Sequence, residues 1–239
     1  MKTLTFISIS ILSGVIAGII LAIVNQGVVE PFIERAIAIE NQKAMSQGEM
    51  IDPAAMLAYR VWQKEGSIAA GAILGLSYGA LLGVVFAYAR SSLPGGSNVK
   101  KALLLAGVMW FVLYFVVALK YPANPPAVGN PDTIYLRESL YVVFVAISGF
   151  SALGLAYLYR MLAKTQARKA LPAVYAGIMA IAFFALPNNP DQITAPMDLV
   201  ISFRVATALT MSMFWGLLGA ILGALWDRAK PHETKMATA

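Results

Sequence analysis

Six long runs of apolar residues divide the chain, separated by short stretches that carry most of its charges. A helix that crosses the hydrocarbon core of a bilayer, about 30 Å thick, needs roughly 20 predominantly apolar residues. Runs of about this length lie at residues 4–25, 67–89, 102–119, 140–159, 171–186 and 199–226. They predict an all-α integral membrane protein with about six transmembrane helices.

The first and fifth runs each need a comment. Lys2 before an apolar stretch is also typical of a signal peptide, but the first run is long and contains no small-residue cleavage site. We therefore expect it to be a retained helix. The fifth run is short and bounded by Pro172 and Pro187, and proline disrupts helices.

The segment 26–66, between the first two runs, also shows helical patterns. Asp52 followed by Pro53 is typical of an N-cap with proline at the first helical position, so the second helix is expected to begin here. Earlier in the segment, apolar residues recur with helical spacing beside charged ones: Phe32, Ile33, Ala36 and Ile37. They predict an outer amphipathic helix, either on the membrane surface or against the bundle.

Composition agrees with a membrane location. Of 239 residues, 59% are apolar and 13% are charged, and the mean hydropathy is +0.71, whereas a soluble domain carries about 25% charged residues. The absence of cysteine excludes disulfides, thiolate metal sites and cysteine nucleophiles. The net charge of +6 comes from basic residues in short loops, so topology explains it and no nucleic-acid partner is expected.

The distribution of lysine and arginine orients the helices. With six crossings, one side has two acids and eleven basic residues, a net charge of +9. These basic residues are Lys2, Arg90, Lys100, Lys101, Arg160, Lys164, Arg168, Lys169, Arg228, Lys230 and Lys235. The other side has seven basic and ten acidic residues, a net charge of −3 that could concentrate cations. Because basic loops stay in the cytoplasm, we predict that both termini and the tail 227–239 are cytoplasmic. Residues 1–239 are expected to form one multi-pass domain in the inner or plasma membrane.

The odd-numbered runs resemble one another, and so do the even-numbered runs. The first, third and fifth each contain Ala-Gly followed by aliphatic residues, beginning at Ala17, Ala106 and Ala176, while the second, fourth and sixth each end in an aromatic residue followed by arginine. This pattern predicts three two-helix hairpins repeated in parallel. The alternative is that glycine and interfacial aromatic residues are frequent in all membrane helices.

Two runs contain glycines spaced along one helix face: Gly71, Gly75, Gly79 and Gly83 in the second, and Gly216, Gly219 and Gly223 in the sixth. Such faces let helix backbones approach closely in a membrane. We expect a structural role for both.

Similar turns follow the third and fifth runs, Pro122-Ala123-Asn124-Pro125 and Pro187-Asn188-Asn189-Pro190. Proline ends a helix, lacks an amide donor and forces the preceding residue into extended geometry. Carbonyls and asparagine amides are then free to face a shared cavity, and non-helical backbone at membrane depth is tolerated where protein or water covers it. We predict that the two turns line an outer vestibule; the alternative is a pair of stiff turns with no ligand role.

Arg204 lies inside the sixth run, where an arginine that faces lipid is unfavourable. We expect it either to face inward with an acidic partner or to reach outward to the membrane boundary. Facing inward, it could serve as a structural ion pair, a gate or an anion ligand. The candidate residues of a substrate pathway around the two turns are Asn124, Asp132, Arg137, Glu138, Asn189, Asp191, Asp198 and Arg204.

Motifs for catalysis are absent from the sequence. It contains no Gly-x-x-x-x-Gly-Lys-Ser/Thr nucleotide loop, no His-Glu-x-x-His and no nucleophile elbow. His232, the only histidine, lies in a polar tail where we expect it to be solvated. We therefore predict no enzymatic activity and no cofactor, and the metal ligands, if there are any, stay unknown.

The stretch from Lys120 to Pro131, rich in proline and asparagine, together with Arg137, resembles the signature of the CbtA family. The resemblance extends through most of the chain. It implies a cobalt transporter subunit linked to cobalamin biosynthesis, with cobalt as transported ion, and a very small single-helix partner, CbtB, that carries histidines. It implies no role for any individual residue.

The residues themselves leave the cargo open. Cobalt(II) is suited to imidazole and oxygen ligands, and the apolar runs contain no histidine. Asparagines, acids and turn carbonyls would have to supply oxygen ligands, or a histidine-bearing partner would complete the site. Our leading hypothesis is a membrane subunit of a transition-metal uptake system, with cobalt as the metal, in contact with lipid and compatible with an oligomer. The alternatives are a non-transporting scaffold subunit and a transporter of an anionic or organic solute that uses the arginines.

Overall fold

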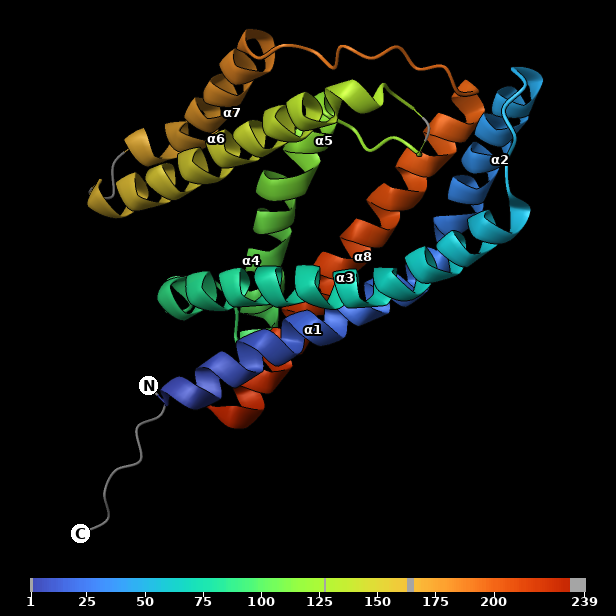
Figure 1. Cartoon of the computed structure of the whole chain (residues 1–239). Helices are drawn as coiled ribbons and strands as arrows, with labels where there is room; N and C mark the ends of the chain where they lie inside the picture. Colours follow the sequence, from blue (N-terminus) through green and yellow to red (C-terminus); the bar gives the residue numbers. More distant parts are fainter. Residues whose placement is uncertain (1, 127, 163–165, 233–239) are drawn as a thin grey trace.

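The computed structural model describes residues 2–126, 128–162 and 166–232, and this part of the chain is helical with no strand (Figure 1). Six helices are long and apolar enough to span a membrane, the number expected from the sequence. They are α1 (Thr3–Val28), α3 (Pro53–Ala89), the composite of α4 (Asn98–Trp110), π-helix η1 (Phe111–Phe115) and α5 (Val116–Lys120), then α6 (Ile134–Met161), α7 (Ala167–Ala185) and α8 (Met197–Ala229). The chain is thus a multi-pass membrane protein.

Two further helices lie between these spans. A short 3-10 helix, η2 (Pro131–Thr133), leads into α6, and α2 (Glu30–Ser46) follows α1. As predicted, Asp52 caps α3: its side chain accepts hydrogen bonds from the backbone N–H of Ala54 and Ala55. Pro172 lies within α7, which begins before the predicted start of the fifth run.

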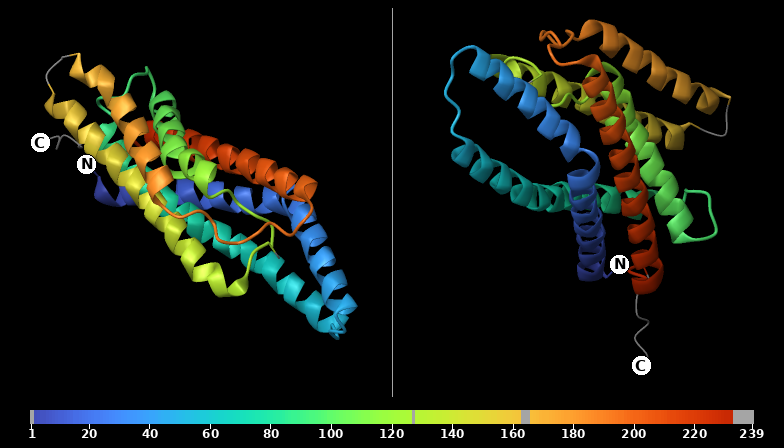
Figure 2. Two further views of the ribbon diagram at one scale, coloured as in Figure 1. Left: turned by 90° about the horizontal axis from the view of Figure 1, so that it is seen from above. Right: turned by 90° about the vertical axis from the view of Figure 1, so that its right-hand side faces the viewer.

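The segment predicted as an outer amphipathic helix forms α2, and it packs against the bundle. Phe32 and Ile33 contact a small apolar cluster that includes Phe203 and Ala206 of α8. On its polar side, α2 is tied to α3 by an ion pair between Glu30 and Arg60, both largely buried. Together α2 and the first turns of α3 project from one end of the bundle (Figure 2).

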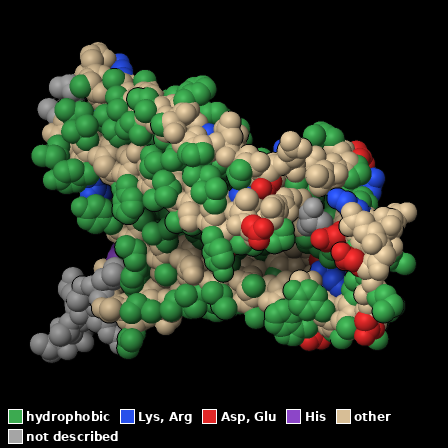
Figure 3. All heavy atoms as spheres, turned by 45° about the horizontal axis from the view of Figure 1, so that its top comes forward, with side chains coloured by type: hydrophobic (Ala, Val, Ile, Leu, Met, Phe, Trp, Pro, Cys, Tyr) green, Lys and Arg blue, Asp and Glu red, His purple; other side chains and the backbone are tan. Residues whose placement is uncertain are grey.

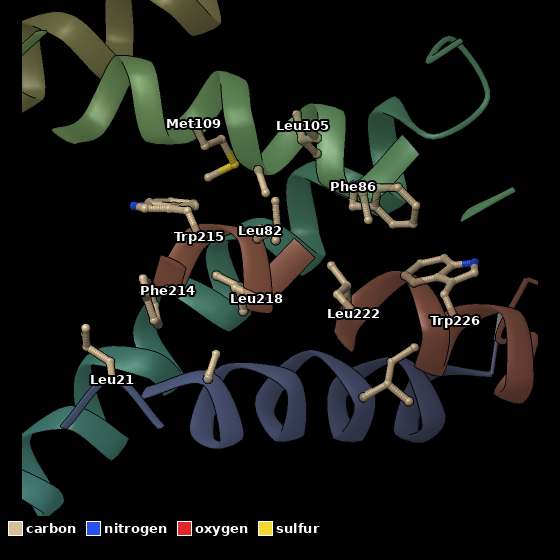
Figure 4. Close-up of a cluster of buried hydrophobic side chains, with 14 residues drawn as sticks. Leu21, Leu82, Phe86, Leu105, Met109, Phe214, Trp215, Leu218, Leu222 and Trp226 are labelled. Carbon is tan, nitrogen blue, oxygen red and sulfur yellow. The ribbon is translucent and has the colours of Figure 1, made fainter. Parts of the chain in front are cut away.

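The core lies where α1, α3, α4 and α8 meet. Gly14 and Gly18 of α1 face Gly71 and Gly75 of α3 so closely that a side chain at any of them would overlap the opposite backbone or side chain. Large side chains of α8 fill the space between this pair and α4 (Figure 4). The largest of them are Phe214, Trp215, Leu218, Leu222 and Trp226. The structural role expected for the glycine faces is therefore confirmed for α1–α3, and for Gly219 and Gly223, which contact α4.

The packing partners follow the predicted hairpins only in part. Helix α3 packs on α1, and α6 contacts η1 and α5 of the third span, as the first two hairpins would, but α7 packs on α6, and α8 packs on α4 and α1. Helices α6 and α7 lie side by side on one flank of the molecule (Figures 1 and 2). The parallel repeat of three hairpins is therefore not confirmed, since neighbours in the fold are set by side-chain packing rather than by sequence order.

Both ends of the described chain lie at the same end of the bundle. The backbone N–H of Lys2 donates to the carbonyl of Pro231 at 2.8 Å. His232 is exposed, as predicted; it also accepts a hydrogen bond from the indole N–H of Trp226 at 3.2 Å and stacks on that ring. Of the predicted tail 227–239, residues 227–229 continue α8, and residues 233–239 lie outside the described part.

Candidate functional site

A cavity of about 1240 Å³ opens at the end of the bundle away from the termini. Acidic and basic side chains gather near this end, whereas hydrophobic side chains cover most of the visible helical body (Figure 3). The cavity is lined by both proline turns, by the last residues of the third span and by parts of α2, α6 and α8. Its polar lining consists of Glu40, Tyr114, Lys120, Tyr121, Asn124, Arg137, Glu138, Tyr141, Asn188, Asn189, Asp191 and Arg204.

Arg204 reaches from α8 into the first proline turn. Its Nη2 donates to Oδ1 of Asn124 at 2.7 Å, and its Nε lies 3.3 Å from both that oxygen and the carbonyl of Ala123. The expectation of an inward-facing arginine is met, but its partners are an amide and a carbonyl. Among the described residues no carboxylate lies within 4.0 Å of Arg204, so its positive charge stays uncompensated at the cavity wall.

The second proline turn is held to the start of α6 by Asp191. Its carboxylate lies 3.0 Å from Nε of Arg137, and its side chain is only 8% exposed. It also accepts hydrogen bonds from the backbone N–H of Asn130 at 3.0 Å and from the hydroxyl of Thr133 at 2.7 Å. The carboxylate is thereby neutralised and fixed in place, so it holds the second proline turn against the start of α6.

Gly129 makes this junction sterically feasible. Its φ of +114° lies in a region that L residues rarely adopt. A Cβ at this position would also lie 2.6 Å from the carboxylate of Asp191 and 2.7 Å from Nη1 of Arg137. Glycine is therefore required both by the backbone and by the ion pair beside it.

Lys120 and Tyr121 join the ends of the third and fifth spans. The ammonium of Lys120 donates to the carbonyl of Phe183 at 2.6 Å and to Oδ1 of Asn188 at 3.1 Å. The hydroxyl of Tyr121 donates to the carbonyl of Pro187 at 2.6 Å, and burial raises the pKa of this phenol. Carbonyls left free where proline ends α7 are thus satisfied by the side chains at the end of α5.

Six of the eight residues proposed from the sequence line this cavity: Asn124, Arg137, Glu138, Asn189, Asp191 and Arg204. Asp198 and Asp132 are not among the lining residues. Asp198 pairs with Arg35 of α2 at 2.9 Å, and both side chains are more than half exposed. Asp132 sits in η2, where its backbone N–H donates to the side chain of Asn130. The participation of the six in transport stays a prediction.

The cavity offers no chelating cluster. Within the described residues, no group of three or more histidine, aspartate or glutamate side chains could hold a metal ion. Its three basic lining residues, Lys120, Arg137 and Arg204, are balanced in number by Glu40, Glu138 and Asp191. The lining is therefore suited to weak contacts with a hydrated or chelated solute rather than to direct coordination of a bare cation.

Sequence reasoning did not assign a role to several of these residues. Lys120 and Tyr121 stand directly before the first proline turn, and that position at the end of an apolar run was the available signal. Gly129, between two prolines, was a signal for a positive φ. Tyr114 and Tyr141 gave no signal, since a tyrosine in an apolar run is common and only the folded arrangement turns both toward the cavity.

A match to a known protein family covers almost the whole chain. The model of this family, described as a probable cobalt transporter subunit (CbtA), matches residues 3–227. The matched range begins with α1 and ends in the last turn of α8, so it includes both proline turns and the cavity. No curated protein and no solved structure matches the chain.

Proposed function

The chain belongs to the CbtA family of probable cobalt transporter subunits, and on this premise we propose that it admits cobalt ions to the membrane through the cavity at its proline turns. The observation that carries the proposal is the convergence of the two turns. Residues separated by more than sixty positions, such as Lys120 and Asn188, meet around one open cavity in a multi-pass membrane protein. A transporter subunit is not an enzyme, and no catalytic role is assigned to the cavity.

The orientation follows from charge. Eleven basic residues lie in the termini and in the loops on the same side of the membrane as the termini, and basic loops remain cytoplasmic. We therefore place both termini in the cytoplasm and the cavity on the outer face of the cell membrane. The excess of acids on that outer side would raise the local concentration of cations.

The mode of binding follows from the lining. Asparagine, glutamate and tyrosine oxygens accept hydrogen bonds from the water molecules of a hydrated cobalt ion, and such contacts are weak enough to release it. Tight ligands would come from a partner subunit, for which a small histidine-bearing, single-helix protein is the candidate. The same partner, or another subunit, would supply the coupling to energy.

Arg204 favours a second candidate. A guanidinium at the cavity wall with only Asn124 and a carbonyl as partners attracts an anion, so the cargo could be an anionic or chelated solute instead of the hydrated ion. The two candidates predict opposite effects of neutralising the arginine. Arg204→Gln lowers the uptake of an anionic chelate but leaves or raises the uptake of the free cation.

Uptake of radioactive cobalt by cells that express the chain, with and without the small partner, tests the proposal. We expect uptake above background with the partner present, and a decrease for Asn124→Ala, which exposes Arg204 to the cavity. Arg35→Ala is the matched control, because Arg35 is exposed on α2 and is not among the lining residues. Background uptake under both conditions, with the protein correctly inserted, would reject transport and favour a scaffold subunit.

A further inference from the structure

The six spans form two packing groups that meet at the third span (Figure 1). Helices α1–α4 and α8 pack among themselves around the apolar core. Helices α6 and α7 pack on each other, on η1 and on α5. Their shared cluster is separate from the core and consists of Val116, Val117, Phe144, Met179 and Ala182. We call α1–α4 with α8 the core group and α5–α7 the flank group.

The third span belongs to both groups and changes partners at its π-helix. Before η1, Leu105 and Met109 of α4 lie in the core, and after it, Val116 and Val117 of α5 lie in the cluster of the flank group. Hydrogen bonds in a π-turn run from residue i to i+5, so the turn contains one residue more than an α-helical turn. Each residue turns an α-helix by about 100°, so the wider turn re-aims the side chains that follow it. The π-helix is therefore the point at which the chain passes from one group to the other.

The flank group supports this irregular turn with side chains. The hydroxyl of Ser148 on α6, which is fully buried, donates to the carbonyl of Val112. Ser148 also shares a hydrogen bond with the hydroxyl of Tyr175 on α7 at 2.7 Å. Helices bend at π-turns, where the ladder of backbone hydrogen bonds is interrupted. The third span can thus change direction here while both of its halves keep their packing partners.

The cavity lies between the two groups. Its wall on the side of the core group includes Ile33 of α2 and Arg204 of α8, and its wall on the side of the flank group includes Glu138 and Tyr141 of α6. The hydrogen bond from Arg204 to Asn124 links the two groups at this end. A rotation of one group against the other therefore changes the width of the cavity.

At the other end of α6, Arg160 joins the flank group to the core group. Its Nη2 donates to the carbonyl of Tyr88 on α3 at 3.3 Å, and its guanidinium lies 4.2 Å from the centre of the Tyr88 ring. This carbonyl belongs to the last turn of α3, where carbonyls lack a helical partner. Among the described residues no carboxylate lies within 4.0 Å of Arg160. The link consists of one hydrogen bond and one exposed cation–π contact, so little free energy is needed to break it.

We propose that the flank group rotates against the core group about the π-helix, and that the contact between Arg160 and Tyr88 is a latch that holds the arrangement with the cavity open. Along α6, Tyr141, Ser148 and Arg160 mark the cavity wall, the pivot and the latch in this order. At a helical rise of about 1.5 Å per residue, Arg160 lies about 18 Å from Ser148, so a rotation of about 10° moves it by about 3 Å and breaks the contact. The same rotation moves Glu138 and Tyr141 toward the opposite wall of the cavity.

This inference rests on the proposed transport function, to which it adds a movement. Transporters expose a site to one side of the membrane at a time by rocking one group of helices against another. Here the latch and the cavity wall lie on opposite arms of α6, so widening at one end accompanies narrowing at the other.

Distances between pairs of spin labels, measured in the purified protein without added metal, test the proposal. The chain has no cysteine, so each pair is introduced at exposed apolar positions. Val84→Cys on α3 with Val174→Cys on α7 measures the distance between the groups. Val84→Cys with Leu103→Cys on α4 measures a distance inside the core group, and Leu153→Cys on α6 with Val174→Cys measures one inside the flank group.

Arg160→Gln removes the latch. We expect it to raise the population with a longer distance between the groups about fivefold, the loss of one exposed cation–π contact, and to leave both distances inside the groups unchanged. Arg168→Gln is the matched control, because that arginine lies 4.5 Å from the ring centre of Tyr159 within the flank group and should change none of the three distances. Ser148→Ala loosens the pivot and should broaden only the distribution between the groups.

Three results would contradict the proposal. The same distance distribution in the wild type and Arg160→Gln would overturn the latch, and an unbroadened distribution in Ser148→Ala would overturn the pivot. Equal changes inside and between the groups would mean that the whole fold loosens, which also rejects the rotation. None of these measurements depends on cobalt. An immobile flank group in a protein that takes up cobalt rejects the rotation alone, and a mobile flank group in a protein without uptake rejects transport alone.

Discussion

Two helix pairs of this protein, α1 with α3 and α6 with α7, are held together in different ways. In the first pair glycines face each other, and the backbones meet with no room for a side chain. In the second pair the glycines Gly154 and Gly177 have nothing nearby, and most of the large apolar side chains face outward. A membrane protein without a hydrophobic driving force between helices gains stability from close packing and from polar contacts. The first pair relies on close backbone packing. Around α6, α7 and the proline turns, polar contacts add to a small apolar cluster of side chains from α5, α6 and α7.

The difference places rigidity and polar function in separate regions. The glycine-packed pair, with the aromatic residues of α8, forms a fixed scaffold. The cavity lies where helices meet through asparagine, aspartate, lysine and arginine side chains. Polar contacts of this kind can exchange partners with a passing solute, which close backbone packing cannot do.

The largest expected effect comes from a side chain placed between α1 and α3. Gly75→Leu would overlap the carbonyl oxygen of Gly14 and should destabilise the fold by about 3 kcal/mol or more. Gly177→Leu on α7, where nothing lies within 4 Å, is the matched control and should be tolerated. Thermal unfolding followed by size-exclusion chromatography in detergent measures the stability of both variants. Equal destabilisation of the two would mean that the pairs α1–α3 and α6–α7 do not differ in how closely they are packed.

The next largest effect concerns the ion pair between Asp191 and Arg137, which holds the second proline turn to the start of α6. Asp191→Ala leaves Arg137, Thr133 and the N–H of Asn130 without their acceptor, and should cost about 2 kcal/mol, less than a fully buried pair because Arg137 is partly exposed. Asp198→Ala breaks the exposed pair with Arg35 and should cost about 0.5 kcal/mol or less. Denaturant unfolding of the two variants compares their free energies of unfolding, and an equal cost would mean that Asp191 does not hold the second turn to α6.

A smaller effect is expected at the π-helix. Ser148→Ala removes the donor to the carbonyl of Val112 and the partner of Tyr175, which should cost about 1 kcal/mol. Ser77→Ala, whose hydroxyl bonds only within its own helix at 3.0 Å, is the control and should have little effect. If Ser148→Ala is as stable as Ser77→Ala, the polar contacts of α6 contribute less to stability than we expect.

The smallest effect is a pH dependence at α2. A hydrogen bond from Lys64 holds the pKa of Glu34 below its usual value. A lowered carboxylate pKa stabilises the fold above the usual value, and this contribution is lost as the pH falls through the lowered pKa. The melting temperature of Glu34→Gln should therefore lie slightly below that of the wild type at pH 7 and approach it as the pH falls through the lowered pKa, and a gap that widens on acidification would contradict the assignment.

The sequence was sufficient for the spans and for half of the polar residues that line the cavity. The length of an apolar run predicts a membrane crossing almost independently of the helices that pack beside it. The start of α3 is defined by its own residues, Asp52 and Pro53. Residues near two proline turns were good candidates because both turns fall at the same end of the spans.

What could not be predicted depends on partners. Every face of a membrane helix is apolar, so sequence periodicity does not show that α7 packs on α6 while α8 packs on α4. Arg204 has an amide, Asn124, in place of the expected acidic partner, and one of the candidate acids, Asp191, is bound by Arg137 instead. The π-turn at Phe111–Phe115 likewise depends on Ser148 from another helix and leaves no mark in its own residues.

The central claim is that both proline turns line one cavity open to the outer aqueous side. Labelling of single thiols in intact cells with a membrane-impermeant maleimide tests it directly, using Ala123→Cys and Asn188→Cys in the turns and Ser92→Cys in the loop between α3 and α4. We predict that both turn positions react in intact cells and that Ser92→Cys reacts only after permeabilisation. Reaction of one turn from outside and of the other only from inside would contradict the cavity, its orientation and the transport route together.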